Sequence, residues 1–243
     1  RLGIVTNWLA EDHCDILLIQ ETKSRDMNFP IAAFEDIGWY VAFHGQKSYN
    51  GVAIASRRMI EDVKYGLPGD VADEQARYME ATVDGIRVAT IYLPNGNPAP
   101  GPKFDYKLDW LDRLEARATK LLESEMPVVL GGDYNVIPED KDCFDPAGWA
   151  GDALTLPQSR AAFRRLIHCG YTDALRSLHP SEVFYTYWDY QAGAWQRDNG
   201  VRIDHFLMSP EAIDRLEQVV IDRGPRGLEK PSDHTPILCT LRS

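Results

Sequence analysis

The chain has 243 residues, of which 37 are acidic and 26 are basic, so its formal net charge is −11. Apolar residues make up 44% and charged residues 26%, a mixture typical of globular proteins that excludes disorder, collagen-like repeats and low-complexity tails. No apolar run approaches the roughly 18 residues of a transmembrane helix, and no signal segment is recognisable. The four scattered cysteines favour free thiols in a reducing cytoplasm, where we expect the protein to act.

The first half of the chain is predicted to contain short helices and strands. Residues 3–13 read as the end of a helix. Residues 15–21 have four consecutive apolar residues between polar ones, which predicts a strand covered on both faces. Asp84-Gly85 predicts a hairpin turn. The remaining elements predicted here are a helix at 30–37, strands at 39–43, 51–56, 78–83 and 86–93, and a long amphipathic helix at 105–124.

The second half begins with a strand at 126–135 that, like the first, is apolar and ends in polar groups. An irregular loop is predicted at 139–158 and an aromatic loop at 188–195. The other predicted elements are a helix at 159–169 and strands at 184–187, 201–208 and 236–241. No repeat, linker or break in composition divides the chain, so we expect a single domain over residues 1–243.

Polar side chains lie at matching ends of the predicted apolar strands. Glu21, Asp133 and Asn135 follow two strands, whereas Asp233 and His234 precede the last one. If that last strand is antiparallel to the first two, these groups meet at one rim, where like charges repel unless a cation or a shared proton compensates. Oxygen ligands without clustered Cys or His favour Mg²⁺ or Mn²⁺. Each residue alone could be a solvated strand end, a turn or a surface pair, but the combination is more specific.

The motifs, taken in order, resemble those of the exonuclease III family of apurinic/apyrimidinic endonucleases, in the endonuclease/exonuclease/phosphatase superfamily. Relatives that act on lipids or inositols share the catalytic ends, whereas Ser48-Tyr49-Asn50-Gly51, Tyr92-Leu93-Pro94-Asn95 and the aromatic loop point to the DNA-repair branch. The stretches that carry the resemblance are 19–23, 47–54, 92–96, 131–136, 202–205 and 232–236.

The resemblance implies an α/β fold of the DNase I-like type, a two-sheet β-sandwich flanked by helices. It also implies a Mg²⁺-dependent, or alternatively Mn²⁺-dependent, hydrolase of base excision repair. Such an enzyme incises double-stranded DNA 5′ to abasic sites, with 3′–5′ exonuclease activity and trimming of blocked 3′ ends. We expect a monomer in the bacterial cytoplasm, associated with the nucleoid. The acidic net charge counts only weakly against DNA, because the basic residues are clustered, for example Lys103 with Lys107 and Arg197 with Arg202.

The resemblance also implies a role for each matching residue. Glu21 and Asp233 correspond to residues at the metal. Asp133 would activate the attacking water, and Asn135 would orient it. The remaining catalytic and phosphate-contacting positions are Tyr92, Asn95, Asp204 and His234, with Asp204 holding the imidazole. The pocket for the base-free sugar would be walled by Tyr187 and Trp188, with Val201 and Ile203 nearby, although two or three of the loop aromatics could instead pack in the core.

One departure from the family pattern concerns a Trp-Asn motif on a strand upstream of the first helix. Thr6-Asn7-Trp8 has a similar composition but lies within the predicted helix, so we expect Asn7 to be an ordinary helix residue. The upstream strand is then missing, and we expect that residues have been lost before Arg1 and that the sheet and the metal site are incomplete. Two alternatives stay open: a phosphatase or phospholipase for a small phosphoester, and a catalytically weakened DNA-binding homologue.

Overall fold

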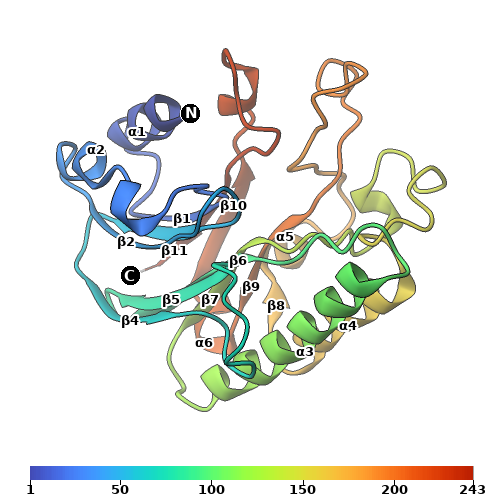
Figure 1. Cartoon of the computed structure of the whole chain (residues 1–243), viewed down its shortest axis with the longest axis horizontal. Helices are drawn as coiled ribbons and strands as arrows, with labels where there is room; N and C mark the ends of the chain where they lie inside the picture. Colours follow the sequence, from blue (N-terminus) through green and yellow to red (C-terminus); the bar gives the residue numbers. More distant parts are fainter. Residues whose placement is uncertain (243) are drawn as a thin grey trace.

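Two β-sheets face each other in the computed structural model of the chain, which describes residues 1–242 (Figure 1). The smaller sheet contains β1 (Ile16–Gln20), β3 (Val52–Ser56) and β2 (Tyr40–His44), in that order. The larger sheet has the order β4 (Ile60–Tyr65), β5 (Tyr78–Val83), β6 (Ile86–Tyr92), β7 (Val128–Asp133), β9 (Asp204–Met208) and β8 (Thr172–Asp173). A separate antiparallel pair, β10 (Leu216–Ile221) and β11 (Ile237–Leu241), lies next to β9. The predicted α/β sandwich is confirmed.

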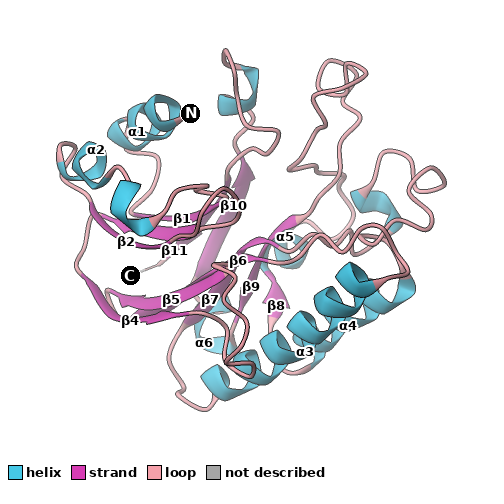
Figure 2. Ribbon diagram, viewed as in Figure 1, coloured by secondary structure: helices cyan, strands magenta, loops and turns pink. Residues whose placement is uncertain are grey.

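Helices cover the outer faces of the two sheets (Figure 2). The smaller sheet packs against α1 (Leu2–Ala10) and α2 (Ile31–Glu35), and the larger sheet packs against α3 (Pro102–Leu122) and α4 (Pro157–His168). The short helices are α5 (Ala174–Leu178), α6 (Pro210–Ile213), η1 (Asp26–Asn28), η2 (Asp140–Asp142) and η3 (Pro225–Gly227). Within residues 1–242, no helix combines the length and the apolar character that a membrane span requires.

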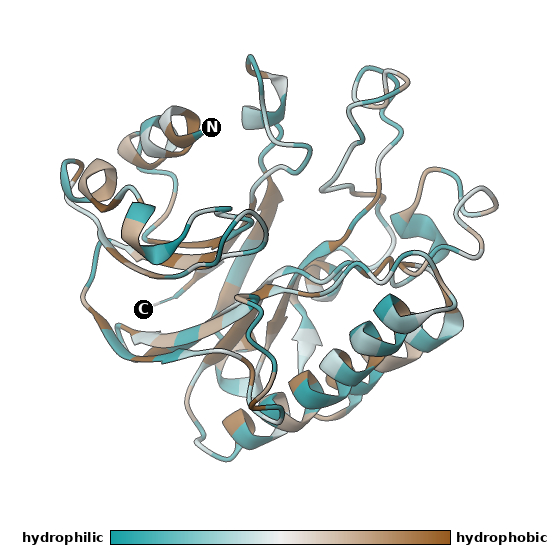
Figure 3. Cartoon of the chain, in the orientation of Figure 1, coloured by the Kyte–Doolittle hydropathy of each residue, from teal (hydrophilic) through white to brown (hydrophobic). Residues whose placement is uncertain are grey.

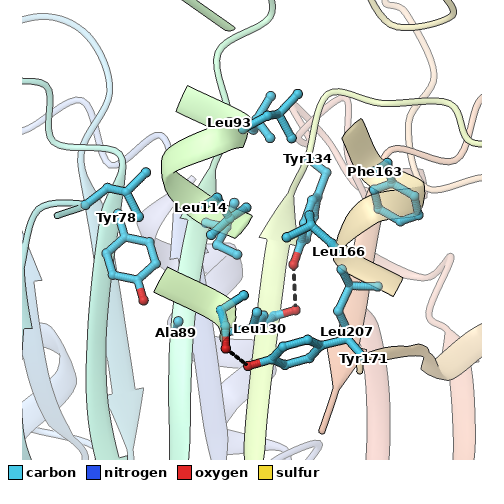
Figure 4. Packing of buried hydrophobic residues seen from close by; sticks show 14 of the residues in the cluster. Tyr78, Ala89, Leu93, Leu114, Leu130, Tyr134, Phe163, Leu166, Tyr171 and Leu207 are labelled. Atoms are coloured by element: carbon cyan, nitrogen blue, oxygen red, sulfur yellow. Dashed lines mark hydrogen bonds between the residues drawn. The ribbon is translucent and has the colours of Figure 1, made fainter. Parts of the chain in front are cut away.

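The main hydrophobic core lies between the larger sheet and α3 and α4 (Figure 4). Leu114 of α3, Phe163 of α4 and Leu130 of β7 are buried together there, and each such side chain stabilises the fold by about 1.5–3 kcal/mol. The hydroxyl of Tyr134 donates to the Leu130 carbonyl at 3.0 Å, which satisfies the one polar atom that this ring brings into the core. Hydrophilic residues predominate on the visible side of α3, as an amphipathic helix requires (Figure 3).

Strand β7 sets the register of the functional residues. It pairs in parallel with β6, which aligns Asp133 with Tyr92, and antiparallel with β9, which aligns Asp133 with Asp204. The two glycines before Asp133 permit this close packing. A Cβ at Gly131 would lie 2.7 Å from a Leu18 methyl of the opposite sheet, and one at Gly132 would lie 2.1 Å from the Ile91 carbonyl oxygen. Side chains at the ends of three strands are thereby placed side by side.

An open slot lies between β1 of the smaller sheet and β11 of the separate β10–β11 pair. Within residues 1–242, β1 pairs only with β3 and β11 only with β10. A cavity of about 960 Å³ is lined by every residue of these two strands. Asn7 lies on the exposed side of α1, as expected. The unpaired strand edges are where a further strand would fit.

Several predicted elements need correction. Residues 184–187 do not form a strand, because Tyr187 makes only isolated bridges, to Val201 and His234. The strand predicted at 201–208 begins at Asp204. The first strand was expected to be covered on both faces, but all residues of β1 are partly exposed because the strand borders the open slot. Strands β4 and β10 were not predicted; charged or polar residues interrupt the apolar ones in both, at Glu61 and Asp62 of β4 and at Glu217 and Gln218 of β10.

Candidate active site

The end of β7 places a buried carboxylate among amide groups. Asp133 is 4% exposed, and its Oδ1 accepts a hydrogen bond from the Asn135 backbone N–H at 2.8 Å. The side-chain amide of Asn135 donates to the other carboxylate oxygen at 3.0 Å and to the Leu93 carbonyl at 2.9 Å. Asn135 has a φ of 46°, a left-handed conformation that Asn tolerates in such turns. The Asn95 amide, from the loop after β6, donates to Asn135 Oδ1 at 3.1 Å.

An Asp–His pair stands across from this carboxylate. Asp204, at the start of β9, lies 2.9 Å from Nδ1 of His234, which precedes β11. The sequence analysis predicted this pairing, and the structure confirms it. Because Asp204 holds Nδ1, Nε2 is the imidazole nitrogen that can donate to a substrate. The Tyr187 ring contacts His234 edge-on, with 5.0 Å between ring centroids, and supports the imidazole from the side.

The pKa values of both Asp133 and His234 are raised in this site. Burial raises the pKa of Asp133 to about 7; the positive charge of His234 opposes this rise, and the nearby Asp204 carboxylate adds to it. Burial alone would lower the pKa of His234, but the Asp204 and Asp133 carboxylates outweigh it and raise this pKa to about 10. Both pKa values are raised, so His234 is an imidazolium at neutral pH and can serve as a hydrogen-bond donor, while the Asp133 carboxyl group binds a proton more tightly than a solvent-exposed Asp does.

Glu21, just past β1, is held by two neighbours. The Tyr92 hydroxyl donates to one of its oxygens, and the Lys23 ammonium lies 3.0 Å from the other. Burial would raise the pKa of Glu21, but these two hydrogen bonds outweigh it and lower that pKa. Burial and the adjacent Glu21 carboxylate raise the pKa of Tyr92, so the phenol stays protonated and remains a donor. The sequence analysis did not single out Lys23, although its position two residues after Glu21 could have suggested the contact.

The predicted metal ligands are not gathered into one cluster. Among residues 1–242, no three His, Cys, Asp or Glu side chains come together as a ready metal site. Glu21 lines the cavity together with Asp133, whereas the Asp233 carboxylate accepts hydrogen bonds from Tyr190 and Ser232, both at 3.4 Å. A single carboxylate is nevertheless the kind of ligand that hydrated Mg²⁺ uses, because this ion keeps several of its waters. Glu21 therefore fits a divalent cation with few protein ligands.

The structure corrects the predicted sugar pocket. Trp188, Val201 and Ile203 are 0%, 1% and 3% exposed, so they present almost no surface to a ligand. Val201 and Ile203 belong to a hydrophobic cluster beneath the site, and the Trp188 indole donates to Asp198 at 3.0 Å while packing against Trp195. Of the four residues predicted for the pocket, only Tyr187 is partly exposed, beside His234. Val201 and Ile203 belong to the core beneath the site, and Trp188 serves the packing of its loop.

Comparisons with known proteins agree with this geometry. Residues 1–234 match the model of the Endonuclease/Exonuclease/phosphatase family. The chain is 32% identical to exodeoxyribonuclease III of Haemophilus influenzae over 92% of this chain and 88% of that protein. It superposes with a TM-score of 0.98 on the 3′ phosphatase NExo from Neisseria bound to a product DNA hairpin (41% identity, covering 100% of this chain and 95% of that one). An AP endonuclease from Archaeoglobus fulgidus gives a TM-score of 0.96 at 39% identity, with coverages of 100% and 95%.

Proposed function

The chain belongs to the endonuclease/exonuclease/phosphatase family, and within it we propose that it is a DNA-repair hydrolase. Its reaction is cleavage of DNA phosphodiesters 5′ to abasic sites, together with removal of blocking groups and nucleotides at 3′ ends. The observation that carries this proposal is the grouping of Asp133, Asp204 and His234 at one end of a cavity that Glu21 also lines. The names of similar proteins, exodeoxyribonuclease III, a 3′ phosphatase and an AP endonuclease, support the same chemistry.

The geometry suggests how each residue acts. Asp133, once ionised, takes a proton from the attacking water, which Asn135 holds in place. The His234 imidazolium, held by Asp204, donates to the negative charge that develops on the phosphate. Tyr92, at the end of β6, and Asn95, in the loop that follows, contact the same phosphate. Glu21 would hold a divalent cation, Mg²⁺ in our proposal, which when bound would neutralise further charge on the phosphate.

The proposed partner is double-stranded DNA with an abasic or 3′-blocked site. Loops 187–200 and 222–235 project at the same end of the molecule (Figure 1). They carry the exposed cations Arg197, Arg223 and Lys230, which can contact phosphates. Two cations that the sequence analysis grouped with such clusters, Lys107 and Arg202, are buried and cannot do so. We further propose a monomer in the cytoplasm, close to the nucleoid.

The test is a comparison of substrates with Mg²⁺ present. An abasic duplex and a duplex with a 3′-phosphate should both be processed, whereas inositol phosphates and phospholipids should not. Preferential hydrolysis of the small phosphoesters would replace this proposal with a superfamily phosphatase or phospholipase. Tight binding of the abasic duplex without cleavage would indicate a weakened DNA-binding homologue, an alternative that the open slot and the dispersed carboxylates keep relevant.

A further inference from the structure

A fully buried lysine lies directly behind the candidate active site. Lys107, on the inner face of α3, is 0% exposed. Its ammonium donates to the backbone carbonyl of Asn95 at 3.0 Å and to that of Asn135 at 2.6 Å. No ion pair to Lys107 is present in the part of the chain that the structure describes. Burial lowers its pKa to about 7, although Asp133 and Asp152 are near enough to oppose the change.

Stability alone does not account for a lysine in this position. Burying a cation among neutral partners is unfavourable unless its hydrogen bonds compensate, and an apolar side chain of similar size is often equally stable or more so. Methionine has nearly the same length and would fill the same space in α3. What methionine lacks is a donor that can hold two carbonyl groups at once. The feature to explain is therefore the pair of carbonyls that the ammonium contacts.

Those carbonyls belong to the two loops that contain the catalytic amides. Residues 93–97 follow β6, and residues 133–137 lie at the end of β7 and just beyond it. The Asn95 and Asn135 side chains bond to each other at 3.1 Å, while their backbone carbonyls both accept from the ammonium of Lys107. The same two residues are thus joined twice, once through their side chains and once through the lysine.

The loop after β6 is shaped around the lysine. Gly96, between Asn95 and Asn97, has a φ of 91°, which side chains rarely adopt. A Cβ at this position would lie 2.6 Å from Cδ of Lys107. Asn97 continues the connection, because its amide donates to the Asp152 carboxylate at 3.1 Å. Gly96, the aliphatic part of Lys107 and the flanking asparagines Asn95 and Asn97 therefore pack closely together.

We propose that Lys107 is a positioning residue for the reaction. Its ammonium holds the loops 93–97 and 133–137 together, so that Asn95 and Asn135 can contact the same phosphate. The assignment rests on the function proposed above. Lys107 itself does not touch the substrate, since it has no exposed surface. Its effect reaches the chemistry through the orientation of Asn135, which also holds Asp133.

The test compares Lys107→Met with Lys120→Met, a matched change at an exposed position of the same helix. For Lys107→Met we expect kcat on an abasic duplex to fall about 10- to 100-fold, because displacements near 1 Å can reduce rates about 10²-fold. KM should change less than about threefold, since the DNA-facing surface is untouched. Amide hydrogen exchange should become faster in residues 93–97 and 133–137 but should not change in α3. Lys120→Met should change neither measurement.

A second variant keeps the test decisive if Lys107→Met does not fold. Lys107→Gln retains an N–H donor in a neutral side chain, and we expect it to fall between wild type and Lys107→Met in both kcat and loop exchange. Unchanged exchange in the two loops, or an unchanged kcat, would overturn the assignment. If the wild-type protein cleaves no DNA substrate, the proposed function fails separately, and the exchange measurement alone then decides whether Lys107 joins the loops.

Discussion

Replacing Asp133 with Asn should separate the chemical role of this residue from its structural one. The amide has nearly the same shape, and its oxygen can still accept the Asn135 backbone N–H. It cannot take a proton from water, however, and losing a general base typically reduces a rate about 10²- to 10⁴-fold. We therefore expect Asp133→Asn to fold and to bind abasic DNA with Mg²⁺, but to incise it at least about 100-fold more slowly.

The same substitution should stabilise the folded protein at alkaline pH. The pKa of Asp133 is raised from 3.8 to about 7, so the folded state holds this proton more tightly than the unfolded chain does. Ionisation then destabilises the fold progressively as pH rises from about 4 to about 7, with the full effect above 7. Because Asn carries no charge, the variant should melt at a higher temperature than the wild type at pH 8 and at the same temperature near pH 4.

Two measurements check this pair of expectations. Single-turnover incision of an abasic duplex at saturating enzyme isolates the chemical step from product release. Thermal melting of the metal-free protein between pH 4 and pH 8 reports the stability difference. Asp36→Asn, at an exposed position after α2, is the control and should alter neither result. Incision at near wild-type rate would mean that another group is the base, and a lower melting temperature at pH 8 would show that Asp133 is needed for the fold.

Three further expectations concern Asp204, the divalent cation and the open slot. Asp204→Asn removes the anion that raises the pKa of His234 to about 10, so the imidazolium is lost at lower pH. The alkaline limb of the single-turnover pH–rate profile should move down, and an unchanged limb would remove Asp204 from the site. Chelation of divalent metal should abolish incision but not binding of abasic DNA; incision that persists in excess chelator would argue against the cation. A version with an added N-terminal strand bearing Asn should have a higher melting temperature and tighter Mg²⁺ binding than this chain, and equality in both would refute the idea.

Part of the proposed catalytic site was predictable because the positions of its residues depend on local sequence. An apolar run followed by a carboxylate places that carboxylate at a strand end, whatever the strand pairs with. Asp133 could be identified in this way, whereas Asp204, which begins β9, was implied only by the family resemblance; the two lie opposite each other in the sheet. The Asp204–His234 pair was implied by the resemblance, and it fits the sequence because His234 and Asp233 are adjacent and should point to different sides. The structure shows that divergence, with Asp233 bonded to Tyr190.

The features that sequence reasoning missed depend on packing between distant segments. Aromatic residues in a polar loop are equally suited to contact a ligand or to form the core of the loop. The role of Trp188 becomes evident from its packing contacts, among them those with Arg223 and Trp195. Lys107 illustrates the converse. In sequence it is one of several cations on an amphipathic helix, and nothing local distinguishes it from Lys103 or Lys120. Its burial becomes evident only when the loops after β6 and β7 are placed beside α3.

The open slot and the dispersed metal ligands are connected by geometry. The cavity between β1 and β11 is bordered by Glu21, Asp133, Asp204 and His234 as well as by the two strands. A chain segment that paired with both strand edges would therefore extend to the catalytic groups, because strands run straight at about 3.3 Å per residue. A side chain at that end of the segment would lie near Glu21, where an amide or carboxylate oxygen would add a ligand for a cation. Closing the sheet and completing the metal site should accordingly occur together, so that melting temperature and Mg²⁺ affinity rise in parallel.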